Sequence, residues 1–288
     1  MTTAETRTRA PGLDEAFEAE LEAMALEAAA PPVEEPREPA LPRYLKWQLR
    51  DFLKQRAVVM LAVVFGLLWI FHHNYPLMLA ERAARMGQPL SASREARLFQ
   101  SIVLGASMLF GVAASLFSAG GVVSRDREGG YQRFLFAKPV GIVGFYLQSF
   151  AVRGVGMLAT MAVALLATSA VFMRSIPIGD LLLAGGSMYA ALGGLVFLIS
   201  TLVRFDVALA LALGVASVGL HQAAQAGYWW GSAFAWLLPP PDVFNAFNPD
   251  MDGFDKPSVV RAVATLVGYG AAYVAAGVAV LRKRSIIG

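Results

Sequence analysis

The chain has 288 residues, of which 57% are hydrophobic and only 16% are charged, and its mean hydropathy is +0.55. A soluble domain carries about 25% charged residues, and the apolar residues of this chain form long runs instead of recurring at amphipathic spacing. These values exclude most soluble enzymes, fibres and disordered chains, and they predict a polytopic membrane protein. The absence of cysteine excludes disulfides, thiolate metal sites and cysteine nucleophiles, and three scattered histidines are too few for a histidine metal cage.

The net charge of +3 is the sum of two opposite parts. Residues 1–40 hold ten acidic and three basic residues, whereas residues 41–288 hold eleven acidic and 21 basic residues. The acidic part is rich in Ala, Glu and Pro, a composition that cannot bury a core. We therefore expect residues 1–40 to be a disordered cytoplasmic tail, with a transient helix over residues 15–29. A solvated extension is the favoured interpretation, and a partner-binding tail is the alternative.

Residues 41–56 show helical amphipathicity. Five apolar side chains share one face of a helical wheel: Leu41, Leu45, Leu49, Phe52 and Leu53. Four basic side chains share the opposite face: Arg43, Lys46, Arg50 and Lys54. This pattern predicts an amphipathic elbow helix that lies on the membrane surface before the chain enters the membrane. The alternative is that the basic residues simply flank a span.

Six apolar segments follow, each long enough to cross about 30 Å of hydrocarbon. We expect them at residues 57–75, 101–123, 150–172, 181–203, 207–226 and 259–281. The fold class is therefore all-α integral membrane, with a six-span domain over residues 57–288. With the N-terminus inside, fourteen Lys and Arg residues lie beside the spans on the inner side and seven on the outer side. This ratio places both termini in the cytoplasm.

Two connections on the predicted outer side are long. Residues 76–100 are polar and are expected to be partly helical. Residues 227–258 combine aromatic residues with a run of three prolines, which predicts short re-entrant or interfacial helices before the last span. Asp250, Asp252 and Asp255 in this connection look like a fragment of a calcium loop, but the full ligand spacing is missing and an ordinary turn is the favoured interpretation.

Catalytic and nucleotide-binding motifs are missing from the sequence. It contains no phosphate-binding loop of the G-x-x-x-x-G-K-[ST] type, no G-x-S-x-G nucleophile elbow and no H-E-x-x-H zinc helix. His221, with Gln222 and Gln225, is the one titratable residue well inside an apolar segment. We interpret it as a neutral histidine bonded to a neighbouring helix, and a proton or ion relay is the alternative.

The loop over residues 124–148, between the second and third spans, carries the most informative pattern. Charges of both signs at Arg125, Asp126, Arg127 and Glu128 are followed by two glycines and an aromatic stretch. The stretch contains Tyr131, Phe134, Leu135 and Phe136 and closes at Pro139. A short exposed helix with these side chains is an apolar surface that requires a partner. The alternative is that it inserts among lipid headgroups.

At this loop the sequence resembles the type-2 ABC transporter permeases, the membrane subunits of many bacterial ABC exporters. Their pattern is an acid-Arg-Glu-x-Gly cluster, a short helix and then a proline before the third span. Asp126-Arg127-Glu128-Gly129-Gly130 matches the cluster and Pro139 matches the proline, with Asp where the family more often has Glu. The elbow helix, the six spans and the aromatic-proline segment also agree, so the resemblance covers residues 41–288.

The resemblance implies a permease that pairs with a second permease in the bacterial cytoplasmic membrane. Separate ATPase subunits would dock on the loop, so ATP and magnesium would belong to the partner and this chain would bind no cofactor. The implied coupling residues are Asp126, Arg127, Glu128, Gly130, Tyr131, Phe134, Phe136 and Pro139. No nucleic acid is expected as a partner, and the sequence does not choose a substrate. The alternatives are an ion-coupled secondary transporter and a membrane assembly subunit without transport.

Overall fold

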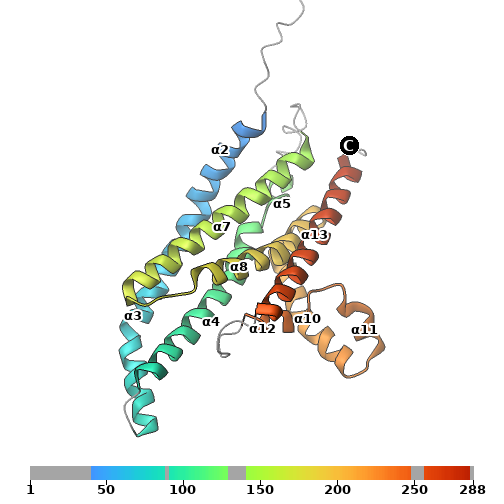
Figure 1. The fold of residues 1–288 in the computed structure, drawn as a ribbon. Helices are drawn as coiled ribbons and strands as arrows, with labels where there is room; N and C mark the ends of the chain where they lie inside the picture. Colours follow the sequence, from blue (N-terminus) through green and yellow to red (C-terminus); the bar gives the residue numbers. More distant parts are fainter. Residues whose placement is uncertain (1–39, 88–90, 129–140, 248–255, 286–288) are drawn as a thin grey trace, which may run out of the picture. The chain divides into compact units, whose positions relative to one another are not determined.

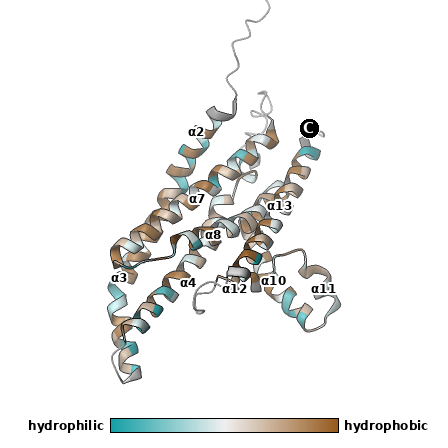
Figure 2. Ribbon diagram, viewed as in Figure 1, coloured by the Kyte–Doolittle hydropathy of each residue, from teal (hydrophilic) through white to brown (hydrophobic). Residues whose placement is uncertain are grey.

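The long helices of this protein follow from its apolar runs, because a backbone in hydrocarbon must satisfy its hydrogen bonds within its own segment. The computed structural model describes residues 40–87, 91–128, 141–247 and 256–285, and its regular elements in these ranges are all helices (Figure 1). Six of them are long and apolar enough to cross a membrane. Hydrophobic residues run along these helices in Figure 2. The prediction of an all-helical, multi-pass membrane protein is therefore confirmed.

The spans agree closely with the sequence prediction. The six candidate spans are Tyr44–Arg85, Ala92–Asp126, Ile142–Phe172, Ile178–Leu202, Asp206–Gln225 and Ser258–Lys283. The fifth agrees with its predicted bounds within one residue and the fourth within three residues. The first three are longer than predicted and extend into residues 41–56, 76–100 and 124–148. Helix α3 (Val58–Met86) and helix α4 (Ala92–Ala119) fill most of residues 76–100, which confirms that this connection is partly helical.

The predicted elbow is a helix, α2 (Ala40–Phe52), that continues into α3 through a π-helical turn at Leu53–Ala57. Its basic side chains Lys46, Arg50 and Lys54 are exposed, and so are Leu45 and Leu49 on the other face. The side chain of Arg43 and the acidic tail lie outside the described residues. The helix is thus present and amphipathic, and its position on a membrane surface stays a prediction.

The fourth span lies at the centre of the helical packing. It consists of α8 (Ile178–Met188), a π-helical turn at Tyr189–Gly193 and α9 (Gly194–Leu202), and it contacts α4, α7 (Ile142–Phe172) and α13 (Lys256–Ser285). A Cβ on Gly194 would lie 2.9 Å from the Gly270 carbonyl oxygen. Small residues here let the fourth and sixth spans approach closely, as expected for helices in lipid.

The connection before the last span folds back along its neighbours. Helix α11 (Trp229–Ala235) packs against α10 (Asp206–Gln225), and the short α12 (Asp242–Asn245) contacts α13. The carbonyl oxygens of Trp236, Leu237 and Pro239 accept hydrogen bonds from the hydroxyls of Tyr269, Tyr273 and Ser217, respectively, at 2.9, 2.6 and 3.1 Å. Ser217 and Tyr273 lie near the middle of their helices. The chain therefore returns to the mid-height of these two spans.

One end of the helices is closed by an aromatic group. We use the name aromatic cluster for Phe71, Tyr75, Phe99 and Phe172 together with the ion pair between Arg174 and Glu95. The ring centroids of Phe99 and Phe172 lie 5.1 Å apart, and Arg174 lies over Phe99 at 5.0 Å from its centroid. These residues come from the ends of the first three spans and from the chain after the third, all of which were predicted to share the outer side.

Candidate functional site

The predicted coupling loop begins in the described part of the chain and continues beyond it. Helix α5 (Ser124–Glu128) contains Asp126 and the backbone of Arg127 and Glu128, whose side chains are not described. The remaining predicted coupling residues lie outside the described residues: Gly130, Tyr131, Phe134, Phe136 and Pro139. What the structure places is the base of the loop, where the second span ends. We call this region the inner junction: residues 117–124 with the side chains of Arg56, Arg153 and Asp206.

Arg56 ties the first span to the end of the second. Its guanidinium Nη1 donates to the carbonyl oxygens of Phe117 and of Ser118, the latter at 2.7 Å, and Nη2 donates to the Gly120 carbonyl oxygen at 2.6 Å. The residue is 9% exposed. A buried guanidinium requires hydrogen-bond acceptors, and the last carbonyls of a helix are free and carry partial negative charge. Arg56 therefore caps α4 from another helix.

Arg153 binds the same carbonyls from the third span. Its Nη1 donates to the Gly120 carbonyl oxygen at 2.9 Å and approaches the Ser118 carbonyl oxygen at 3.4 Å. Two arginines thus share the Gly120 carbonyl, and their like charges are tolerated because the helix end presents several acceptors. The end of α4 is fixed to both the first and the third span.

Asp206 binds the next part of the chain from the fifth span. Its carboxylate accepts the backbone N–H of Gly121 at 2.7 Å and the Ser124 hydroxyl at 3.0 Å. It also accepts the N–H of Val207 at the first turn of α10, at 2.8 Å, where a negative charge is favourable. Asp206 is buried, and these donors replace its hydration. It connects the first residue of α5 to the fifth span.

Two glycines make this arrangement possible. Gly121 has φ +69°, the left-handed conformation in which glycine is favoured. A Cβ on Gly120 would lie 2.5 Å from Cγ2 of Val207, so no larger residue fits there unless α10 moves. The chain can therefore turn sharply out of α4 while staying in contact with α10.

Helix α5 also contacts the elbow region and the third span. The Arg125 guanidinium donates to the Gln55 amide oxygen at 3.0 Å, and the Gln55 amide nitrogen donates to Asp51. The carboxylate of Asp126, a predicted coupling residue, is hydrogen-bonded to the hydroxyl of Tyr146 on α7. The start of the loop therefore has side-chain contacts with spans one, three and five.

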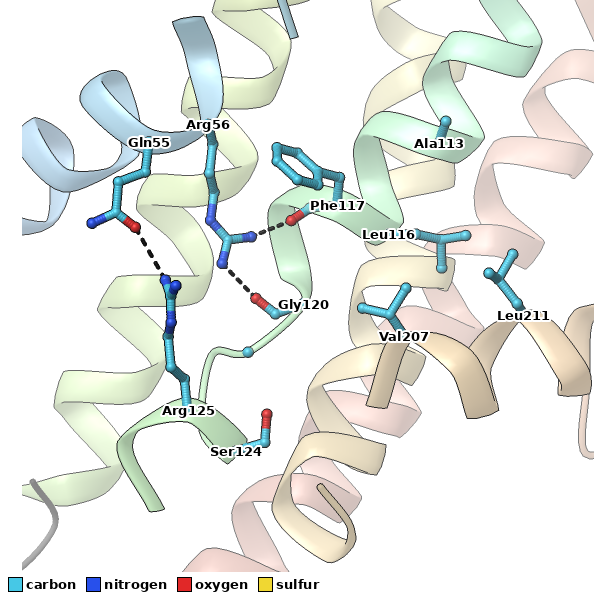
Figure 3. A pocket seen from close by; sticks show the side chains of 11 residues that line it. Gln55, Arg56, Ala113, Leu116, Phe117, Gly120, Ser124, Arg125, Val207 and Leu211 are labelled. Carbon is cyan, nitrogen blue, oxygen red and sulfur yellow. Dashed lines mark hydrogen bonds between the residues drawn. The ribbon is translucent and has the colours of Figure 1, made fainter. Parts of the chain in front are cut away.

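A cavity of about 570 Å³ opens at the inner junction (Figure 3). Arg56 and Arg125 lie at one side of the view, and Leu116, Val207 and Leu211 lie at the other. The lining consists of Gln55, Arg56, Ala113, Leu116, Phe117, Gly120, Gly121, Ser124, Arg125, Val207 and Leu211. The cavity is thus polar at the end of the spans and apolar further in.

Sequence reasoning found the loop but not the residues that hold its base. Arg56 and Arg153 were among the fourteen Lys and Arg residues counted on the inner side, and Asp206 lay in the short connection between the fourth and fifth predicted spans. None of the three was given a partner. The signal that could have revealed them is a charge at the end of an apolar run, because such a charge must be bonded: Arg153 lies just inside one, and Arg56 and Asp206 lie directly before one. Their acceptors and donors are backbone groups, which leave no trace in the sequence.

The polar residue deep in the fifth span binds its own helix. His221 Nδ1 lies 2.8 Å from the Ser217 carbonyl oxygen, one turn earlier in α10. The predicted bond to a neighbouring helix is therefore replaced by an intrahelical one. In the described ranges, no group of three or more His, Cys, Asp or Glu residues could hold a metal ion. Asp250, Asp252 and Asp255 lie outside the described residues.

Comparisons with protein-family models, with curated proteins and with solved structures give no match. The argument about function therefore starts from the inner junction and from the arrangement of the spans.

Proposed function

We propose that this chain is the membrane permease subunit of an ATP-driven ABC transporter, acting as a dimer and coupled to separate ATPase subunits through residues 124–148. It resides in the bacterial cytoplasmic membrane with both termini in the cytoplasm and works as an exporter. The observation that carries the proposal is the inner junction. The base of the loop is bonded to Arg56, Arg153 and Asp206, so a force applied to the loop reaches three spans at once.

The grouping of charges at one end supports the proposed orientation. Arg56, Arg125 and Arg153 are three of the fourteen basic residues counted on the inner side, and they meet at the inner junction. The C-terminal part of the last span joins them there, since Leu281 packs with Val122 and Val123. The cytoplasm is the side that the excess of Lys and Arg favours.

The segment that returns after α10 supports the predicted re-entrant element. Its carbonyl oxygens at Trp236, Leu237 and Pro239 are bonded by side chains from the middle of spans five and six. Irregular backbone at such a depth is tolerated only where its polar groups are satisfied by protein or by a water-filled path. The aromatic side chains of this segment suit an amphipathic or lipid-like substrate.

The test is whether the loop binds an ATPase. Tyr131→Ala combined with Phe134→Ala removes two apolar anchors, each worth roughly 2–4 kcal/mol at an interface hot spot, so affinity should fall by more than tenfold. We expect an ABC-type ATPase to co-purify with the wild-type chain from its native membrane, identified by its nucleotide-binding motif and by ATP hydrolysis. The double variant should lose it while the six spans still fold.

Phe205→Ala is the matched control, because Phe205 is an aromatic residue at the same end of the spans and is 78% exposed. It should retain the ATPase. If the double variant retains it as well, with unchanged hydrolysis, the coupling assignment is wrong. Transport driven by an ion gradient without any ATPase would instead favour a secondary transporter.

A further inference from the structure

The cavity at the inner junction combines features that together select one kind of ligand. It lies between the end of α4 and the start of α10, where two spans leave the hydrocarbon. Ala113, which lines the cavity, precedes Gly120 by two turns of α4, so the cavity extends about 10 Å along this helix from its end. A molecule that fills it needs a polar part at headgroup level and an apolar part beside the helices.

The charge of the lining is positive. Among the described residues, the charged side chains that line the cavity are Arg56 and Arg125, both guanidinium groups. Three nearby carboxylates do not line it: Asp206 accepts hydrogen bonds from Gly121 and Ser124, Asp51 accepts one from Gln55, and Asp126 is hydrogen-bonded to the Tyr146 hydroxyl. Arg125 is exposed and hydrogen-bonds the neutral Gln55 amide. The ion pairs of the described residues do not include Arg125, so an anionic oxygen can be added to this neutral hydrogen bond.

The opposite wall is apolar. Leu116, Val207 and Leu211 line this wall, and Phe117 adds an apolar ring beside Arg56, whose guanidinium lies 5.6 Å from the ring centroid. A volume of about 570 Å³ lies within the range of about 300–1,000 Å³ that holds a small-molecule ligand. This wall distinguishes the cavity from a site for a free anion, which would gain nothing from it. Basic pockets between spans at a membrane surface are suited to anionic lipid headgroups.

We infer that this cavity binds an anionic phospholipid, with its phosphate at Arg125 and one acyl chain against Phe117 and Leu211. A bound lipid would lie against both the end of α4 and the start of α10, and so would support the inner junction from its open side. The inference goes beyond the proposed function and requires no ATPase, because the site is formed by this chain alone.

The experiment measures lipid retention by the full-length chain. The purified protein is exchanged into vesicles of phosphatidylglycerol and phosphatidylcholine in equal amounts, extracted in mild detergent, and its retained lipids are counted by native mass spectrometry. We expect phosphatidylglycerol to be retained over phosphatidylcholine by roughly fivefold, the effect of one basic group at an anionic lipid. Arg125→Gln should abolish this preference.

Arg204→Gln is the matched control, because Arg204 is an exposed arginine at the same end that does not line the cavity. It should keep the preference. Ala113→Trp, which places bulk from an exposed position into the apolar part, should lower retention of both lipids at this site. An equal loss of preference in the Arg125 and Arg204 variants would overturn the inference, because it would indicate a diffuse surface charge.

A competition experiment with inorganic phosphate distinguishes a bound lipid from a bound free anion. Addition of millimolar inorganic phosphate should leave phosphatidylglycerol bound, since the apolar wall holds the acyl chain. Complete displacement of the lipid by phosphate would show that the cavity takes a free anion, and it would overturn the assignment of a lipid.

Discussion

The two ends of the helices are held together in different ways. At the aromatic cluster, Phe71, Tyr75, Phe99 and Phe172 pack ring against ring, and one ion pair lies at the edge. At the inner junction, side chains from three spans bind backbone groups of residues 117–124 through directional hydrogen bonds. Apolar packing resists any displacement, whereas hydrogen bonds to a row of carbonyls can be exchanged one for another.

This difference suits two separate roles for the aromatic cluster and the inner junction. We propose that the aromatic cluster keeps three spans together and that the inner junction transmits movement of the loop to the spans. If so, substitutions at the cluster should change stability and leave the response to ATP intact. Substitutions at the inner junction should change both.

The largest effect is expected at the aromatic cluster. Phe99→Ala removes a side chain that is 1% exposed and contacts three other rings, so it should lower the free energy of unfolding by about 3 kcal/mol. Unfolding in mixed micelles with increasing SDS measures this change. Leu109→Ala, at a position that is 73% exposed on the same helix, should have little effect. Equal losses in the two variants would contradict the role of the cluster.

Arg56→Met, at the inner junction, should lower the free energy of unfolding by a similar or slightly smaller amount. It removes the charged donor of the Phe117 carbonyl oxygen and leaves the Ser118 and Gly120 carbonyl oxygens to Arg153 alone, and a hydrogen bond to a charged group contributes about 1.5–3 kcal/mol. We expect a loss of about 2–3 kcal/mol in the same assay, together with reduced coupling to the ATPase. Lys54→Met, at an exposed position of the same turn, should be nearly neutral.

Gly120→Ala should lower the free energy of unfolding by about 1–3 kcal/mol, because its Cβ would clash with Val207. Combination with Val207→Ala should recover part of this loss, and the double-mutant cycle gives the coupling energy. Gly105→Ala on the same helix meets no atom within 4 Å and should be neutral. A strictly additive double mutant would show that the two residues do not interact.

The smallest effect is expected at Arg174. Its ion pair with Glu95 is only partly buried, with each side chain 30% exposed. Such pairs contribute about 0–1 kcal/mol, and the ring of Phe99 below the guanidinium adds a contribution of similar size. Arg174→Gln should therefore lower the thermal midpoint only slightly. A loss as large as that of Phe99→Ala would mean that charge, not ring packing, holds this end.

The positions of the six spans could be predicted from the sequence, but the contacts between the spans could not. Long apolar runs predict helices because lipid leaves the backbone no other partner, and all six were located. The sequence did not predict that α2 continues into α3 as one helix. A helical wheel of residues 41–56 shows which side chains share a face, but it does not give the angle between this helix and the span that follows. The hydrogen bonds of Arg56, Arg153 and Asp206 to residues 117–124 depend on how the helices pack in three dimensions. Charge counts along the sequence do not contain this information.

The central claim is that the inner junction moves when ATP is used while the aromatic cluster stays fixed. The chain has no native cysteine, so spin labels attach only at introduced positions. One pair, Leu53→Cys with Phe205→Cys, reports on the inner junction, and another, Leu77→Cys with Met173→Cys, reports on the aromatic cluster; all four positions are exposed. Diluting the labelled chain with unlabelled chain removes distances between protomers.

The distances are measured by pulsed electron paramagnetic resonance in the reconstituted complex with its ATPase, without nucleotide and with ATP trapped. We expect the distance distribution of the first pair to shift on trapping, that of the second to stay unchanged, and the shift to disappear in Tyr131→Ala with Phe134→Ala. Identical distributions for the first pair in both states, while ATP hydrolysis and transport proceed normally, would contradict the account.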